Sequence, residues 1–197
     1  YKWEKGIKSL ISYRKEFGNC VVKHNFQYDD FNLGAWVSAL RLKKYQMTSK
    51  RLNFLDDLGF VWDVLEFQWE IGFHHLVGYK EEFGDCLVKA KGPYRGYKLG
   101  QWVSGQRRDQ EKLESKQHKR LDDLGFVWDV LEFQWEKGFK LLIDYKKEFS
   151  DCLVPQGSQY LDYNLGQWVT VQRSRKNKLT PERLKRLDDL GFVWKVR

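Results

Sequence analysis

The chain has 197 residues, of which 42% are hydrophobic and 16% aromatic, and it carries a formal net charge of +8. This composition is too apolar for a disordered tail, so we expect packed structure. No apolar run is long enough for a spanning helix and no apolar leader follows a positive start, so we expect neither a membrane span nor a secretory signal. The positive charge favours anionic partners such as nucleic acid or an anionic membrane surface.

A tandem repeat organises the chain. Shifting the sequence by 66 residues aligns all nine tryptophans without an insertion, in three sets that begin with Trp3, Trp36 and Trp62. Self-similarity at a fixed period of this length is the signature of a repeat architecture. We therefore predict an all-α tandem array of three compact three-helix units with a 66-residue period. The predicted boundaries are 1–62, 63–128 and 129–197.

The three cysteines occupy one equivalent position in each repeat. Cys20, Cys86 and Cys152 are each 66 residues apart, which indicates small buried thiols rather than a disulfide framework or a metal cluster. We expect an intracellular, reducing compartment, with the nucleus or nucleoid as the location. The chain begins at Tyr1 in mid-pattern and without a methionine, so we also expect it to be an excerpt of a longer protein.

The second repeat displays the first helix of a unit in full. Asp63, with Glu66 three residues later, has the spacing of a capping box with Asp as the N-cap. Apolar residues then recur at spacings of 4, 4, 3 and 7, which line one face of a helix. Gly84 suits the left-handed residue after a helix end. The pattern predicts a helix over 63–83.

A short motif then predicts the second helix of every repeat. It reads LGAWVSALRL at 33–42, LGQWVSGQRR at 99–108 and LGQWVTVQRS at 165–174. Leu99, Trp102 and Val103 share one helical face. We expect them and their counterparts to be buried, and the basic residues after them to reach the flank of the helix.

The last repeat displays the third helix best. Thr180 is the predicted N-cap, Pro181 fits the first helical position, and Gly191 ends the helix. Between these ends, a stripe of leucines faces the core: Leu184, Leu187 and Leu190.

Residues with catalytic or metal-binding potential give little support for an enzyme. GQWVSGQR has the two glycines of a phosphate-binding loop but lacks its lysine and hydroxyl residue, and it lies inside a predicted helix. None of the four histidines recurs, and His74 and His75 are adjacent, hence about 100° apart on a helix. We interpret the histidines as solvated and expect no catalytic residue, no metal and no cofactor.

Paired aspartates recur in the last turn of the third helix: Asp56 and Asp57, Asp122 and Asp123, Asp188 and Asp189. Negative charge there costs about 0.3 to 1 kcal/mol against the helix macrodipole, so a partner is expected. The available partners are the equivalent arginines that end the second helix, Arg41, Arg107 and Arg173. An ion pair within the repeat therefore competes with a nucleic-acid-binding role for these arginines, and the sequence leaves both open.

Basic residues gather where the second helix meets the third. The windows 1–66, 67–132 and 133–197 carry net charges of +3, 0 and +5. Repetition of positive charge at one junction favours a phosphate-contacting surface over a merely solvated face. The candidate nucleic-acid-binding residues are Arg41, Lys43, Lys44, Arg107, Arg108, Arg173, Arg175, Lys176, Lys178, Arg183, Lys185 and Arg186.

The loop before the second helix repeats a pair of aromatic residues: Tyr28 and Phe31, Tyr94 and Tyr97, Tyr160 and Tyr163. Such rings either stack on bases or cover a small core. We expect them to cover the core.

The repeated start W..G...L..Y...F, the middle LG.WV..QR and the end L..LGF.W resemble the helicase-associated domain, in three copies over essentially the whole chain. Leu40 replaces the glutamine of the middle motif in the first copy. The resemblance implies a three-helix, nucleic-acid-binding module, and any ATPase activity would lie elsewhere in a longer chain. We predict a non-enzymatic module that binds DNA rather than RNA. The alternative is a tandem helical scaffold for protein–protein interaction.

Overall fold

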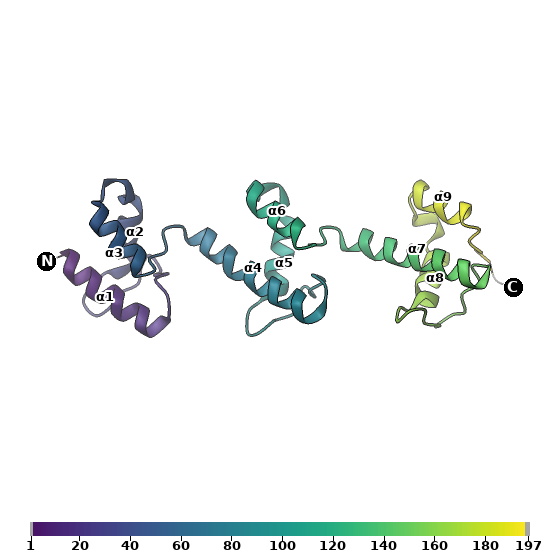
Figure 1. The fold of residues 1–197 in the computed structure, drawn as a ribbon, viewed down its shortest axis with the longest axis horizontal. Coiled ribbons are helices and arrows are strands. Elements are labelled where there is room, and N and C mark those ends of the chain that lie inside the picture. The colour runs from purple at the N-terminus through teal and green to yellow at the C-terminus, as the bar shows by residue number, and fades with distance from the viewer. Residues whose placement is uncertain (1, 196–197) are drawn as a thin grey trace. The chain divides into compact units, whose positions relative to one another are not determined.

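The computed structural model describes residues 2–195, which fold as nine α-helices and three one-turn 3-10 helices, with isolated bridges and no strands (Figure 1). The all-α prediction is confirmed. The first repeat contains α1 (Lys2–Phe17), α2 (Leu33–Leu42), η1 (Lys44–Gln46) and α3 (Ser49–Asp57). The second contains α4 (Val64–Phe83), α5 (Leu99–Arg108), η2 (Gln110–Lys112) and α6 (Ser115–Asp123). The third contains α7 (Val130–Phe149), α8 (Leu165–Ser174), η3 (Lys176–Lys178) and α9 (Pro181–Asp189).

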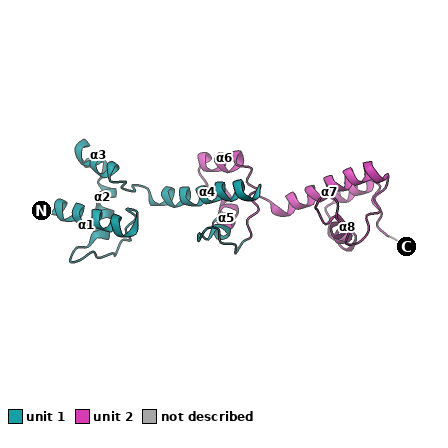
Figure 2. Cartoon of the chain, turned by 60° about the horizontal axis from the view of Figure 1, so that its bottom comes forward, with its two compact units in different colours: residues 1–84, 90–103 teal, residues 85–89, 104–197 magenta. Residues whose placement is uncertain are grey.

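The internal contacts divide the chain into two compact units (Figure 2). The first unit comprises residues 1–84 and 90–103, and the second comprises 85–89 and 104–197. The division falls inside the second repeat, because α4 belongs to the first unit and α6 to the second. The first and third repeats each lie within one unit.

The predicted start and end of α4 and the predicted start of α9 are confirmed. The Asp63 carboxylate accepts the backbone N–H of Glu66 at 2.9 Å, and α4 ends at Gly84, whose φ of 82° is left-handed. The Thr180 hydroxyl likewise accepts the backbone N–H of Arg183, with Pro181 in the first helical turn. In the third repeat Ser150 takes the place of Gly84 with a φ of 67°, in a region that disfavours a residue with a β-carbon.

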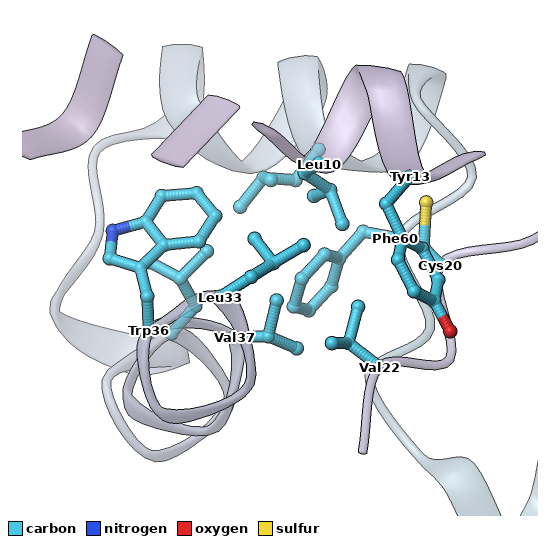
Figure 3. Close-up of a cluster of buried hydrophobic side chains, with 10 residues drawn as sticks. Leu10, Tyr13, Cys20, Val22, Leu33, Trp36, Val37 and Phe60 are labelled. Atoms are coloured by element: carbon cyan, nitrogen blue, oxygen red, sulfur yellow. The ribbon is translucent and has the colours of Figure 1, made fainter. Parts of the chain in front are cut away.

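One leucine from each helix forms the centre of the core in the first repeat. Leu10, Leu33 and Leu55 are fully buried. Trp36, Val37 and Phe60 lie beside Leu10 and Leu33 in the same cluster (Figure 3). The third repeat has the same arrangement, with fully buried Leu142, Leu165 and Leu187. The motif leucines and valines are thus buried as predicted. Trp36 and Trp168 are buried too, whereas Trp102 is half-buried.

A glycine of the first helix lets the tryptophan of the second helix approach the backbone. In the first repeat the ring of Trp36 covers Gly6, and in the third the ring of Trp168 covers Gly138. In the second repeat a β-carbon added at Gly72 would lie 2.1 Å from the indole nitrogen of Trp102. No side chain fits between helix and indole, so the close approach requires glycine.

The three cysteines are buried and form no disulfide, as predicted. Each thiol donates to a backbone carbonyl after the third helix of its own repeat, at 3.6 to 3.8 Å: Cys20 to Leu58, Cys86 to Leu124 and Cys152 to Leu190. Burial raises the pKa of Cys20 and Cys152. The thiols therefore act as small core residues that also hold the end of the third helix.

A 3-10 turn that the sequence pattern does not predict lies between the second and third helices of each repeat. A single turn of this kind has no periodic apolar pattern of its own. In the third repeat, Arg175 ends α8 and the turn η3 follows immediately, before the extended Leu179 and Thr180. This turn projects the basic residues of the junction away from the core.

We predict that Gly72→Ala destabilises the protein by about 1 to 3 kcal/mol, because its methyl group collides with the indole of Trp102. Gly105→Ala is the matched control, since Gly105 is also helical and has open space where its β-carbon would lie. The control should be neutral or stabilising by up to about 1 kcal/mol. Chemical denaturation measures the free energy of unfolding of both variants. Equal changes in the two variants would contradict the tight Trp102–Gly72 contact.

Candidate nucleic-acid interface

The turn that joins the second and third helices carries the exposed basic residues of the third repeat. Arg175, Lys176 and Lys178 follow one another at the end of α8 and in η3, and all three are exposed. Within residues 2–195 none of the three forms an ion pair, although the Lys176 ammonium lies 4.5 Å from the centre of the Trp194 ring. Three cations therefore face solvent within four residues of chain.

The first repeat has a smaller version of this basic turn. Lys43 is exposed, and Lys44 is half-buried with its ammonium 4.9 Å from the centre of the Trp62 ring. Tyr45 follows and is 97% exposed. The sequence analysis did not single out Tyr45, because nothing in the periodicity separates an exposed tyrosine from one that covers the core.

In the second repeat an aspartate partly neutralises the positive charge of the same turn. Asp109 accepts hydrogen bonds of 2.7 Å from both Arg108 and Lys112. These bonds, led by that of Arg108, lower the pKa of Asp109 from 3.8 to about 2. Lys43 and Arg175 occupy the position of Asp109 in the other repeats. A single acidic residue thus makes the turn of the second repeat much less attractive to an anion.

The arginines that end the second helix form neither the ion pair nor the exposed contact surface that the sequence leaves open. Each is half-buried, and its Nε donates at 2.8 to 2.9 Å to a backbone carbonyl after the third helix: Arg41 to Val61, Arg107 to Val127 and Arg173 to Val193. Each guanidinium also lies 5.2 to 5.6 Å from the ring of the phenylalanine before that carbonyl. Burial lowers the pKa of all three arginines, which nonetheless stay charged.

The paired aspartates find a different partner. The first aspartate of each pair accepts a 2.7 Å hydrogen bond from an indole N–H six residues later: Asp56 from Trp62, Asp122 from Trp128 and Asp188 from Trp194. A charge-assisted bond of this kind offsets the unfavourable position of the carboxylate at a helix C-terminus. Of the two alternatives left open by the sequence, the ion pair with the second-helix arginine is not formed, and the aspartates instead bond to the last tryptophan of each repeat.

Two further candidates on α9 turn inwards. Arg183 and Arg186 form ion pairs with Glu132 and Glu136 of α7, and both guanidinium groups lie over the ring of Trp135. Side chains held in this way are largely unavailable to a partner. Their neighbour Lys185 is exposed. The structure thus keeps Lys43, Lys44, Arg175, Lys176, Lys178 and Lys185 as accessible cations. Arg108 is exposed too, but it is paired with Asp109. Internal contacts hold the remaining candidates, which are Arg41, Arg107, Arg173, Arg183 and Arg186.

The recurring aromatic pair belongs to the core, as expected. The two residues form a backbone bridge in each repeat: Tyr28 with Phe31, Tyr94 with Tyr97 and Tyr160 with Tyr163. The first hydroxyl of each pair donates to a glutamate of the preceding helix, as Tyr94 does to Glu82 at 2.9 Å. Tyr28 and Phe31 also pack against the core of the first repeat.

Two of the four histidines differ from the solvated state predicted for them. His118 stacks on Trp128 with ring centres 4.6 Å apart and hydrogen bonds to Asp122. His75 stacks on Tyr97 at 4.4 Å. His24 and His74 are exposed. Aromatic partners from distant parts of the chain were not visible in the helical pattern around these histidines.

Comparison with known families agrees with this geometry. The model of the helicase associated domain matches residues 1–63, 66–129 and 132–195. The chain belongs to the helicase-associated domain family. Its three copies of the domain coincide with the three sets of helices seen in the structure. No curated protein and no solved structure shows significant similarity to the chain, and the described residues 2–195 include no membrane-spanning helix.

We predict that Arg173→Ala lowers the free energy of unfolding by about 1.5 to 3 kcal/mol, because this helicase-associated domain loses a charge-assisted bond to Val193 and a packed guanidinium. Arg175→Ala, the exposed control, should change it by at most about 0.5 kcal/mol. A double-mutant cycle between Arg173 and Asp188 should give no coupling. A coupling energy above about 1 kcal/mol, measured by denaturant unfolding, would show that Arg173 and Asp188 do form an ion pair.

We also predict that the Asp109 carboxyl titrates at about pH 2 in an NMR experiment, well below an ordinary aspartate. Its folded pKa lies below its unfolded value, so the Arg108–Asp109–Lys112 cluster stabilises the turn above about pH 4 and loses this effect as the pH falls towards 2. Arg108→Ala should raise the Asp109 pKa towards 3.8. An unchanged pKa in that variant would show that Arg108 is not the main cause.

Proposed function

We propose that these three helicase-associated domains form a non-enzymatic nucleic-acid-binding module whose partner is duplex DNA. The observation that carries the proposal is the exposed run of Arg175, Lys176 and Lys178 at the 3-10 turn η3 of the third repeat. Family membership supports an association with nucleic-acid-processing proteins. The module would bind and position nucleic acid, while catalysis would belong to other proteins or domains.

Phosphate contact is the chemistry that these side chains suit best. Lysine and arginine at a surface turn neutralise backbone phosphates and release condensed counterions, a contact that needs no particular base sequence. Lys185 on α9 and the smaller turn of Lys43 and Lys44 in the first repeat add exposed positive charge. The neutralised turn around Asp109 contributes little, so we propose that the first and third repeats supply most of the affinity.

Arg175 and Lys178 are separate from the contacts that hold the third repeat together. The guanidinium groups that hold each repeat together are those of Arg41, Arg107 and Arg173, which are half-buried. Lys176 and Lys44, in contrast, also lie over the rings of Trp194 and Trp62. We therefore expect that Arg175 and Lys178 can be changed without disturbing the fold. We also propose a reducing intracellular location, the nucleus or nucleoid, which suits three unoxidised buried thiols and a DNA partner.

We predict that the double variant Arg175→Gln with Lys178→Gln binds duplex DNA about tenfold more weakly than the wild type. The slope of log affinity against log salt should fall by about 2, since two phosphate contacts are lost. Fluorescence anisotropy with a labelled duplex at several salt concentrations measures both quantities. Competition with duplex RNA and single-stranded DNA establishes which nucleic acid is preferred.

Lys89→Gln with Lys91→Gln is the matched control, because both lysines are exposed and the charge change is the same. This control should retain the wild-type salt slope. Equal losses in the two double variants would mean that only net charge matters and that the turn is not an interface. An affinity of the wild type that does not depend on salt, or no binding at low salt, would refute phosphate contact altogether.

A further inference from the structure

The first repeat has an open apolar groove between α1 and α3. Trp3, Ile7 and Ile11 of α1 line it together with Phe54 of α3, and its volume is about 570 Å³. Phe54 is 44% exposed, and the three α1 residues are half-buried. Because these α1 residues are spaced by four, they form a stripe about 12 Å long on one face of the helix. The stripe is long enough to contact two turns of another helix.

The same groove is covered in the third repeat. Arg186 occupies the position of Phe54 there, and its guanidinium lies 4.7 Å from the ring of Trp135 and 4.4 Å from that of Phe139. Its ion pair with Glu136 holds it in place across α7 and α9. Trp135 and Phe139 are consequently only 5% and 7% exposed. In the first repeat Arg51 lies over the ring of Trp3 at 4.5 Å, as Arg183 lies over Trp135, but the second covering arginine is replaced by Phe54.

The rim of the open groove is mainly positive. Lys8 and Lys15 of α1 border it, and Lys50 and Arg51 border the adjoining cavity of about 500 Å³ that Trp3 and Phe54 also line. Glu4 and Asp57 are the acidic residues of the two linings. The third repeat has two more acidic residues at the equivalent positions, with Glu182 in place of Lys50 and Asp144 in place of Ser12, although Lys185 there replaces Asn53. The groove of the first repeat is therefore both open and bordered mainly by positive charge.

We propose that this groove binds an acidic amphipathic helix of a protein partner. Apolar side chains one turn apart would lie against Trp3, Ile7, Ile11 and Phe54, and flanking carboxylates would pair with Lys8, Lys15 and Lys50. An apolar stripe with a cationic border selects such a segment over a basic or a purely polar one. The site is independent of the proposed DNA contact, which uses the turns after the second helices.

The test is isothermal titration of the whole chain with a synthetic helical peptide of about 16 residues that has leucines on one face and glutamates on the other. Phe54→Arg reproduces the third repeat and should weaken binding at least tenfold, although it adds a positive charge. Lys8→Glu with Lys15→Glu should weaken binding to a similar extent. A peptide with lysines in place of the glutamates should not bind.

Tyr45→Arg is the control, because it adds the same charge at a 97% exposed position outside the groove. It should leave peptide affinity unchanged or slightly increased. Circular dichroism should show an intact Phe54→Arg fold, since arginine occupies this position in the third repeat. If Phe54→Arg and Tyr45→Arg tighten binding alike, the attraction is general electrostatics and the proposal is overturned. Self-association of the wild type that Phe54→Arg abolishes would also overturn it, because a second copy would then fill the groove.

Discussion

The contact between an indole and a bare helix backbone is the constraint on which each repeat depends. Trp36 lies on Gly6 and Trp168 on Gly138, so that the second helix packs close to the first. At that separation fully buried leucines from three helices meet in one small core. A repeat of 66 residues has little apolar material to bury, and one large aromatic side chain in close contact supplies a substantial share of it.

Positive charge has two separate tasks in this chain. The arginine that ends each second helix bonds to the backbone beyond the third helix and so closes the repeat, as Arg173 does through Val193. The indole that follows is fixed by an aspartate, as Trp194 is by Asp188. Because these arginines are half-buried and each donates its Nε to the backbone, the cations left for a partner are those on the 3-10 turn, where Arg175 and Lys178 are exposed.

The repeats share a core and differ at the surface. One position in the turn is Lys43, Asp109 or Arg175, which makes the turn basic, neutralised or strongly basic. One position in the third helix is Phe54 in the first repeat and Arg186 in the third, which opens or covers the groove along the first helix. Such exchanges leave the buried leucines untouched, so the copies can acquire different partners while keeping one fold.

The sequence by itself determined the repeat, the helices and their ends, because these depend on spacing and on local capping, as at Asp63 and Gly84. It also identified the family, whose motifs are local in the chain. Only the tertiary structure decided what Arg107 and Arg186 contact and which lysines remain exposed, since their partners lie on other helices or after them. The spacing of apolar residues predicts which face of a helix is buried. It does not predict which carbonyl, ring or carboxylate, distant in the chain, a basic side chain will contact.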